Sequence, residues 1–476
     1  MPKTIVKHNS FGAGELSPRM YARFDVPYYE EGCKRLENMF VKGQGAAVKR
    51  AGTKYIYSVG TAPPPNPTPD PTWEECGQIG NKVDEWEFNS VSAGAKDLVH
   101  VEGTTYAMLY GGTSPPDPIF TFNCDDDGTL GDTVLDSNSG SGYNIVRINI
   151  PGSVTNNFAV FSGISYYNYY LRVSTYSIAA DGTITEIDDR DFTETQVGGA
   201  RVKCVVRMTG NLYAVAGTSQ IVVVQIQDNG IIGDVKDSIV LYSLLLPGQV
   251  GHLGIARIGT TEYVVASRWY ETFHESIGCW RIAAGTGEIT LIDSFPAPLT
   301  TYTSLFETKG CTESGFNGFL LLSRRITPDN KGIQIQSISM SGGNFNQIVD
   351  TIVISADYPC SSPQVAHLGG QGYLVNFMAG IPGGYPIRNY NRNCCATFTC
   401  TSAGALEIKT DVTVVHTDPW VANLYNPIPI QLNGNSDIWM LAMSELNTLD
   451  GWIFTSDIYG GSWCVTYGNC DKYGYR

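Results

Sequence analysis

The sequence predicts an all-β fold in which a unit of four antiparallel strands repeats around a closed ring. Three observations predict it: the composition, a series of regularly spaced turn glycines, and alternating apolar residues on both sides of those turns. The 476 residues include 52 Gly, 27 Tyr and 18 Phe, and many tight turns with many aromatic strand residues are typical of β-rich folds. Hydrophobic residues make up 42% of the chain, which is enough for a large core.

The first 60 residues form a separate segment, which we expect to be a small β-rich platform that docks onto a partner. Residues 1–57 contain 10 Lys and Arg against 5 Asp and Glu, a net charge of +5, so the rest of the chain carries −20. The whole chain has a net charge of −15. Its surface as a whole is therefore unsuited to non-specific binding of nucleic acid, which requires neutralisation of phosphates.

Residues 61–77 are expected to be a linker or surface arm. This segment begins with TAPPPNPTPDPTW, which contains six prolines. Proline removes backbone donors and favours extended polyproline geometry, so the segment is not part of a core.

The repeat begins at about residue 78 and continues to the end of the chain. Each unit ends in a hairpin whose turn contains glycine, often as Asp-Gly or Asn-Gly, which are strong signals for tight hairpin turns. A further pair of strands precedes each hairpin, for example at 203–217 and 253–267. A unit of four strands in 48 to 61 residues predicts the blades of a β-propeller. The turn glycines are Gly128, Gly182, Gly230, Gly287, Gly343 and Gly404.

We count six complete units and a seventh partial one, which covers 430–446 and 451–460. The strand missing from the last unit is expected to come from 81–91, because that stretch alternates well and would close the ring without an exposed edge. The prediction is a seven-bladed β-propeller over 78–476, with six or eight blades as alternatives. A β-sandwich array or a β-helix is also possible, although the repeats of a β-helix are much shorter.

The sequence shows no catalytic or metal-binding motif, so we expect no catalytic residues, no metal and no cofactor. The six histidines include no pair with the spacing of metal ligands. His100, His252 and His367 recur near the first strands of their units, where they either form a ring in the channel or are ordinary strand residues. The acidic stretch DDDG at 125–128 is either a calcium loop or a solvated hairpin tip, and IDDRD at 187–191 indicates the rim of a blade.

The chain contains 12 Cys at irregular spacing. It has no apolar secretory leader and no apolar run long enough to span a membrane. We therefore expect synthesis in a reducing cytoplasm, mostly free thiols and no stable membrane insertion. Cys464 and Cys470 could oxidise later, outside a cell.

The N-terminal segment carries many distinctive residues in a fixed order, in the stretches FGAGELSPRMYARFD, YYEEGCKRLENMFV and GQGAAVKRAGTKYI. Together they resemble the N-terminal signature of tail nozzle proteins of short-tailed, podovirus-type bacteriophages, also called tail tubular protein B. Ala13, Ala22 and Ala51 depart from the usual pattern of that family. From these stretches we select an assembly motif, in which Arg19 and Arg35 are included as basic residues of the proposed interface and the others match the family's pattern: Phe11, Gly12, Gly14, Glu15, Ser17, Pro18, Arg19, Arg23, Asp25, Tyr29, Arg35, Leu36, Asn38, Arg50 and Gly52.

The resemblance implies a structural virion protein without enzymatic activity. Nozzle proteins form a homo-hexamer below the head-tail adaptor (connector), extend and gate the channel for DNA ejection, and support tail fibres and tail tip or needle proteins. Viral DNA would pass without sequence-specific binding. The protein would be made in the cytoplasm of the bacterial host and reside in the virion tail.

Features of the sequence are compatible with such a ring, since contacts in a hexamer join two different patches of each chain. The basic segment could meet a neighbour's acidic body through Arg19, Arg23, Lys34, Arg35, Lys49 and Arg50. Its apolar anchors would be Phe11, Tyr28, Tyr29, Leu36 and Phe40. Two alternatives remain: a propeller enzyme of the lactonase or glycosidase type, and a carbohydrate-binding propeller that attaches to the host surface.

Overall fold

A computed structural model gives the fold of the chain, which divides into two units. One contains Met1–Glu74 with Tyr467–Arg476, and the other contains Glu75–Thr466. The residues that the structure describes are 15–16, 46–51, 54–59, 79–89, 95–110, 119–131, 133–138, 142, 144–148, 156–164, 170–193, 202–217, 220–240, 254–268, 276–296, 305–311, 314–324, 331–380, 390–410, 412–417, 424–431, 438–445 and 450–458.

The described part of the first unit is a small antiparallel sheet in the order β1-β3-β2. Its strands are β1 (Glu15–Leu16), β2 (Ala46–Ala51) and β3 (Lys54–Val59). The predicted N-terminal segment therefore contains β-structure.

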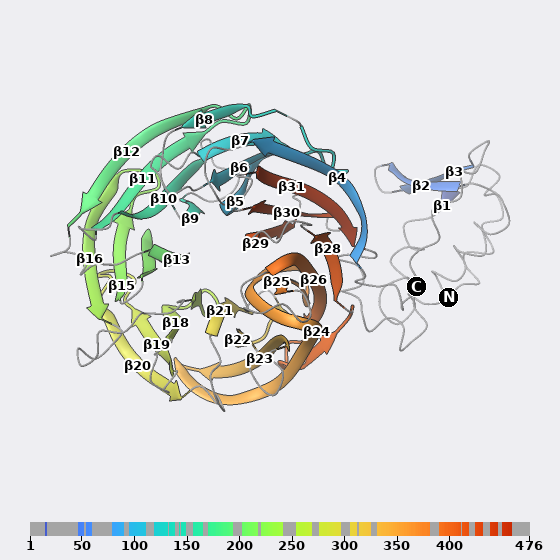
Figure 1. The fold of residues 1–476 in the computed structure, drawn as a ribbon. Coiled ribbons are helices and arrows are strands. Elements are labelled where there is room, and N and C mark those ends of the chain that lie inside the picture. Colours follow the sequence, from blue (N-terminus) through green and yellow to red (C-terminus); the bar gives the residue numbers. More distant parts are fainter. Residues whose placement is uncertain are drawn as a thin grey trace. The chain divides into compact units, whose positions relative to one another are not determined.

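The second unit is a β-propeller, whose sheets follow one another around a common centre in chain order (Figure 1). The first sheet consists of β5 (Ala95–Glu102), β6 (Thr105–Tyr110), β7 (Ile119–Asn123) and β8 (Asp136–Asn138). The second consists of β9 (Asn144–Arg147), β10 (Asn157–Ile164), β11 (Tyr170–Ile178) and β12 (Ile184–Phe192). The third consists of β13 (Val202–Arg207), β14 (Leu212–Gly217), β15 (Gln220–Ile226) and β16 (Ile232–Val240). The fourth consists of β17 (Ile255–Arg257), β18 (Tyr263–Arg268), β19 (Ser276–Ile282) and β20 (Ile289–Pro296).

The fifth sheet has eight strands, and the sixth brings the two ends of the propeller together. The fifth consists of β21 (Leu305–Gly310), β22 (Gly318–Arg324), β23 (Lys331–Ser341), β24 (Asn344–Gly369), β25 (Gly372–Gly380), β26 (Tyr390–Cys400), β27 (Leu406–Ile408) and β28 (Thr413–Thr417). The sixth consists of β29 (Leu424–Gln431), β30 (Ile438–Glu445), β31 (Asp450–Ile458) and β4 (Ile79–Asn89). In it, β4 pairs with β31 along almost its whole length.

The prediction of seven blades is wrong. Within the described residues of this unit, the hydrogen bonding gives six sheets around the ring, so the propeller is six-bladed. The difference arises at β24, a continuous strand of 26 residues. Its first part pairs with β23 and its second part pairs with β25. Two repeat units that the sequence counts separately are therefore joined into one double-width sheet.

The core of the propeller consists of apolar layers between neighbouring sheets. Every residue of β14 is buried, and nearly every residue of β15. These middle strands are covered on both faces, which explains their continuous apolar runs. One such layer joins Phe161 of the second sheet to Tyr213 of the third, with ring centroids 5.9 Å apart. Truncation of a buried aromatic residue of this kind to alanine costs about 3–5 kcal/mol.

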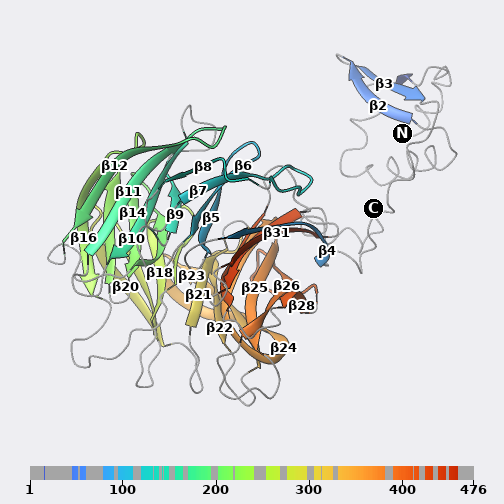
Figure 2. The ribbon, with the colours of Figure 1, turned by 45° about the horizontal axis from the view of Figure 1, so that its top comes forward.

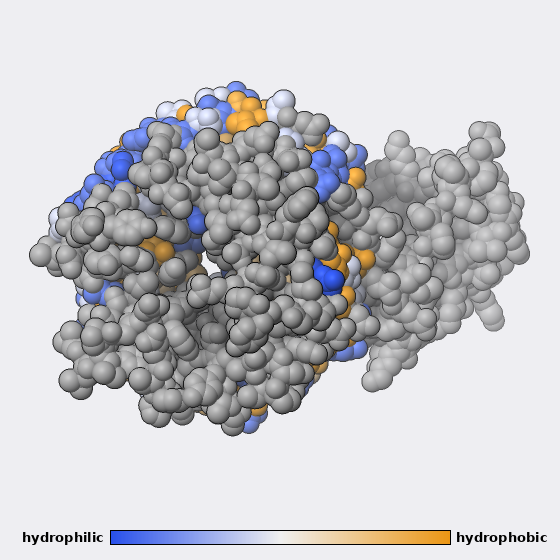
Figure 3. Space-filling model, in the orientation of Figure 1, coloured by the Kyte–Doolittle hydropathy of each residue, from blue (hydrophilic) through white to orange (hydrophobic). Residues whose placement is uncertain are grey.

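The outer strands are more polar than the middle ones. In β12 only the first and last residues are buried, and the tilted view of Figure 2 shows this strand on the outside of the ring. Hydrophilic residues dominate the visible outer edge of the described surface (Figure 3). In the part of the chain that the structure describes, no helix has the length and apolar character needed to cross a membrane.

Candidate functional site

The assembly motif lies largely outside the described residues. Its described members are Glu15 on β1 and Arg50 on β2, which both flank β3. On β3, Ile56 pairs with Glu15 and Tyr55 pairs with Arg50. Two distant motif positions therefore belong to one small sheet. The members outside the described residues are Phe11, Gly12, Gly14, Ser17, Pro18, Arg19, Arg23, Asp25, Tyr29, Arg35, Leu36, Asn38 and Gly52.

The two histidines described near first strands stabilise turns. The Nε2 atom of His100 lies 2.9 Å from the carbonyl oxygen of Gly103, and Nε2 of His367 lies 3.0 Å from that of Gly370. Each ring also packs against a tyrosine. Burial lowers the pKa of His100 below its usual value, so this side chain is neutral near pH 7. His252 lies outside the described residues.

The acidic stretch at 125–128 is the tip of a hairpin. The backbone N–H of Gly128 donates to the carbonyl oxygen of Asp125 at 2.9 Å, and the N–H of Thr129 donates to Oδ1 of Asp127 at 3.0 Å. This second bond lowers the pKa of Asp127. The carboxylate therefore stabilises its own turn.

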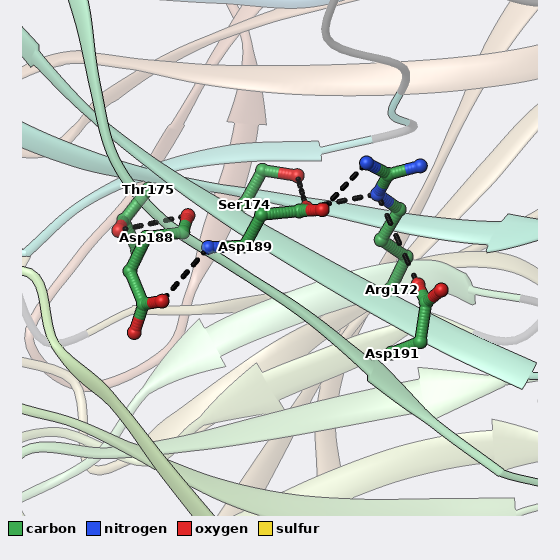
Figure 4. A network of polar contacts seen from close by, with 6 residues as sticks. All are labelled: Arg172, Ser174, Thr175, Asp188, Asp189 and Asp191. Carbon is green, nitrogen blue, oxygen red and sulfur yellow. Dashed lines mark hydrogen bonds and ion pairs between the residues drawn. The ribbon is translucent and has the colours of Figure 1, made fainter.

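The acidic stretch at 187–191 forms a polar network on the outer strand β12 (Figure 4). Arg172 of β11 donates to both carboxylate oxygens of Asp189, at 2.8 and 2.5 Å, and the hydroxyl of Ser174 donates to one of them at 2.6 Å. Burial raises the pKa of Asp189, but these hydrogen bonds lower it by more, so the net shift is downward. Asp189 therefore stays ionised, which does not suit a general acid.

Asp188, in the same stretch, joins two sheets. Its Oδ1 accepts the backbone N–H of Asp189 at 3.0 Å, and its Oδ2 accepts the backbone N–H of Ile232 at 2.9 Å. Ile232 begins β16 of the next sheet and follows the turn glycine Gly230 by two positions. We call this arrangement an Asp–turn bridge: an outer-strand aspartate that accepts a backbone N–H from the turn of the neighbouring unit.

The Asp–turn bridge occurs six times among the described residues, with distances of 2.7 to 2.9 Å between the carboxylate oxygen and the turn nitrogen. In every case the other carboxylate oxygen accepts the N–H of the residue that follows the aspartate. Five pairs join neighbouring sheets: Asp84 with Leu130, Asp136 with Ile184, Asp188 with Ile232, Asp237 with Ile289 and Asp293 with Phe345. The sixth, Asp350 with Leu406, joins two repeat units within the double-width sheet.

The turn glycines are required for two reasons, as Gly230 shows. Its φ is +90°, a conformation that strains any other residue. A Cβ atom at this position would also lie 2.8 Å from Cδ1 of Ile187, the residue that precedes the bridging Asp188. Gly182 repeats both features, with a φ of +90° and a Cβ position 2.6 Å from Leu135. Glycine thus lets the turn reach the aspartate of the neighbouring sheet.

Hydroxyl groups reinforce three of the bridges. The buried side chain of Thr175 donates to the carbonyl oxygen of Gly230 at 2.7 Å. Thr121 makes the same bond to Gly182 at 2.7 Å, and Ser337 makes it to Gly404 at 2.5 Å. At these three turns, both a backbone N–H and a backbone carbonyl are bound by the neighbouring unit.

A related carboxylate joins the inner strands of the first two sheets. Oδ1 of Asp97 on β5 accepts the N–H of Leu98, and Oδ2 accepts the N–H of Ile145 on β9, both at 2.9 Å. Burial raises the pKa of Asp97 to about 6, against the opposing effect of hydrogen bonds from Ile145, Leu98 and Asn144. This is the one described aspartate whose pKa is raised toward neutrality.

Sequence reasoning found the turn glycines but missed the bridging aspartates. The signal was present, because each aspartate follows a glycine by six to eight residues: Gly77 and Asp84, Gly128 and Asp136, Gly182 and Asp188, Gly230 and Asp237, Gly287 and Asp293, and Gly343 and Asp350. These pairs stand out only when the hairpins are aligned on their glycines.

The bridging carboxylates are bound to backbone N–H groups of their own and neighbouring units. No group of three or more His, Cys, Asp or Glu side chains among the described residues could hold a metal ion.

Comparison with known proteins yields no family model that matches the chain and no matching curated protein. Solved structures do match, at low identity. A Bacteroides fragilis protein described as a 6-phosphogluconolactonase has a TM-score of 0.46 and 13% identity, and the match covers 71% of this chain and 89% of that one. The periplasmic gluconolactonase of Pseudomonas aeruginosa has a TM-score of 0.43 and 12% identity, with 68% and 88% covered. Saccharomyces cerevisiae Sqt1 has a TM-score of 0.44 and 10% identity, with 80% and 100% covered. None of these three is named as a phage tail protein.

Proposed function

We propose that this chain is a structural subunit of a short phage tail, of the nozzle type that its N-terminal motif resembles. The observation that carries the proposal is the assembly motif, whose residues occur in a fixed order within the first 60 positions. These positions belong to a unit of their own, apart from the propeller. The proposed assembly is a homo-hexamer that binds the adaptor, carries fibre and needle proteins and lets viral DNA pass.

The Asp–turn bridges support a mechanical role over a catalytic one. They use a repeated set of carboxylates to join units along the outer strands, and each carboxylate already accepts two backbone N–H groups. Hydrogen bonds to charged groups contribute about 1.5–3 kcal/mol each. A ring that must stay closed while DNA moves through an assembly would benefit from such joints.

The proposal is tested by removing one charge from the motif of the full-length chain. Arg50→Gln removes a positive charge from β2, and Arg281→Gln removes one from β19 of the propeller as the matched control. We expect Arg50→Gln to weaken self-association by about tenfold, because arginine is enriched among the few interface residues whose loss costs more than 1 kcal/mol. Arg281→Gln should associate like the unaltered chain. Equal association of both variants in sedimentation equilibrium would contradict the role given to the motif.

A propeller lactonase is the second candidate function, and Asp97 is the observation that favours it. A carboxyl group with a pKa of about 6 is within the range of a general acid or base at neutral pH. The test is hydrolysis of 6-phosphogluconolactone by the full-length chain and by Asp97→Asn. Turnover that disappears in Asp97→Asn would establish the lactonase and overturn the structural proposal. The structural proposal predicts the same rate as buffer alone for both proteins.

A further inference from the structure

Three consecutive inner strands of the propeller end in an arginine. Arg147 is the last residue of β9, Arg207 of β13 and Arg257 of β17. Nη2 of Arg147 donates to the carbonyl oxygen of His100 in the preceding sheet at 3.2 Å. Nη1 of Arg257 likewise donates to the carbonyl oxygen of Arg207 in the preceding sheet at 3.3 Å. The arginines therefore lie at the same end of neighbouring inner strands, in a chain whose net charge is −15.

The described contacts of Arg257 do little to balance its positive charge. Two further bonds go to the carbonyl oxygens of Thr260 and Thr261, at 2.7 and 2.9 Å, which carry no net charge. Burial and the positive charge of Arg207 both lower the pKa of Arg257. Arg207 lies 3.6 Å from a carboxylate oxygen of Asp228, whose side chain is 68% exposed. An ion pair this exposed contributes little, so two positive charges share the junction of the third and fourth sheets.

The junction of the first and second sheets is balanced differently. Nη1 of Arg147 donates to Oδ1 of Asn156 at 2.8 Å, and Nδ2 of Asn156 donates to a carboxylate oxygen of Glu102 at 2.7 Å. The amide thus connects this arginine to a carboxylate of the first sheet. The pair of Arg207 and Arg257 is therefore the better candidate for an anion.

A buried hydroxyl lies at the junction of the third and fourth sheets. Thr209 follows Arg207 by two positions, in the turn between β13 and β14. Its Oγ1 atom is buried and has no hydrogen-bond partner in the described part of the chain. The turn reaches the fourth sheet, because a Cβ atom at Gly210 would lie 2.5 Å from the carbonyl oxygen of Ala284. A buried hydroxyl without a partner is costly and indicates a bound ion or water.

We propose that Arg207, Arg257 and the hydroxyl of Thr209 bind a phosphate ion where the β13–β14 turn meets the fourth sheet. A guanidinium group carries five N–H donors in a planar fork that matches the oxygens of phosphate. The described bonds of Arg257 use three of these donors, which leaves two for the ion. The hydroxyl of Thr209 donates a further bond, and the charge of phosphate neutralises the two adjacent arginines. This site does not depend on the assembly role proposed above.

The test is equilibrium dialysis of the folded full-length chain against radiolabelled inorganic phosphate, with ionic strength held constant by chloride. We expect saturable binding of one phosphate per chain. Arg207→Gln should weaken this binding by about tenfold or more, because it removes a charge-assisted hydrogen bond. No saturable binding up to about 10 mM phosphate, which corresponds to less than about 3 kcal/mol of binding free energy, would overturn the proposal.

Two further variants separate the site from general charge effects. Arg190→Gln is the matched control, because Arg190 also pairs with an exposed aspartate, Asp234, but belongs to β12 of the second sheet. It should bind phosphate like the unaltered chain. Thr209→Val keeps both arginines and the shape of the side chain, and should weaken binding by about threefold to tenfold. Equal phosphate affinity of Arg207→Gln and Arg190→Gln would refute the site. If Arg207→Gln does not fold, unchanged binding by Thr209→Val would refute it instead.

Discussion

The Asp–turn bridge at Asp188 allows a direct test of what joins neighbouring sheets. In Asp188→Ala, the N–H of Ile232 loses the acceptor that lies 2.9 Å away, and the N–H of Asp189 loses its bond of 3.0 Å. Ile232 is only 5% exposed, so its N–H has poor access to water as a replacement. Leaving a buried donor unsatisfied costs about 1–3 kcal/mol, and the charged acceptor favours the upper end of this range. We therefore expect a destabilisation of about 2–3 kcal/mol.

The assay is amide hydrogen exchange of the native protein, because a propeller of this size can open locally before it unfolds globally. If the free energy of local opening falls by about 2 kcal/mol, the amides of Ile232 and its neighbours on β16 should exchange about thirtyfold faster. Asp191→Ala is the matched control on the same strand. Its side chain is 55% exposed and lies 3.9 Å from Arg172, so we expect a change below about 0.5 kcal/mol. Equal exchange at Ile232 in the two variants would refute the bridge as a source of stability.

Three further predictions follow from the same contacts. Gly230→Ala should lower the free energy of unfolding by about 1–3 kcal/mol, because Gly230 has a positive φ and its Cβ position lies close to Ile187. Gly285→Ala is the control, because a Cβ there meets nothing within 4 Å and stability should hardly change. Urea unfolding of both variants measures the difference. Thr175→Val should lower the free energy of unfolding by about 1 kcal/mol, because the hydrogen bond to the Gly230 carbonyl is lost. Amide hydrogen exchange in the β15–β16 hairpin that matches the unaltered protein would argue against this prediction. Asp97 should make the protein less stable as the pH rises from about 4 to about 6, because its folded-state pKa of about 6 exceeds the usual value of 3.8. Above pH 6 the ionisation of Asp97 should lower the free energy of unfolding by up to about 3 kcal/mol. If Asp97→Asn loses stability between pH 4 and pH 6 as steeply as the unaltered protein, the prediction is wrong.

Much of the fold could be predicted from local patterns. Turn glycines such as Gly182 and Gly230 mark hairpins because their conformation is dictated by neighbouring residues in the sequence. The blade count could not be predicted in the same way. Whether β24 breaks or continues depends on its pairing with β23 on one side and β25 on the other, which are contacts between distant residues.

The candidate site was harder to predict than the fold. The acidic stretches at 125–128 and 187–191 stand out in the sequence, but their roles depend on partners far along the chain. Asp188 accepts a hydrogen bond from the backbone N–H of Ile232, 44 positions later. Nearly every residue has a backbone N–H, so the sequence does not single out this partner. The assembly motif shows the opposite case, since its order is visible in the sequence while most of its residues lie outside the described part.

The central claim is that this chain is an assembly subunit, and imaging of the purified full-length protein tests it most directly. Negative-stain class averages should show a ring or tube with sixfold symmetry, and light scattering should give six times the chain mass of 51.8 kDa. A uniform monomer that shows no symmetric particles and hydrolyses a lactone would contradict the account.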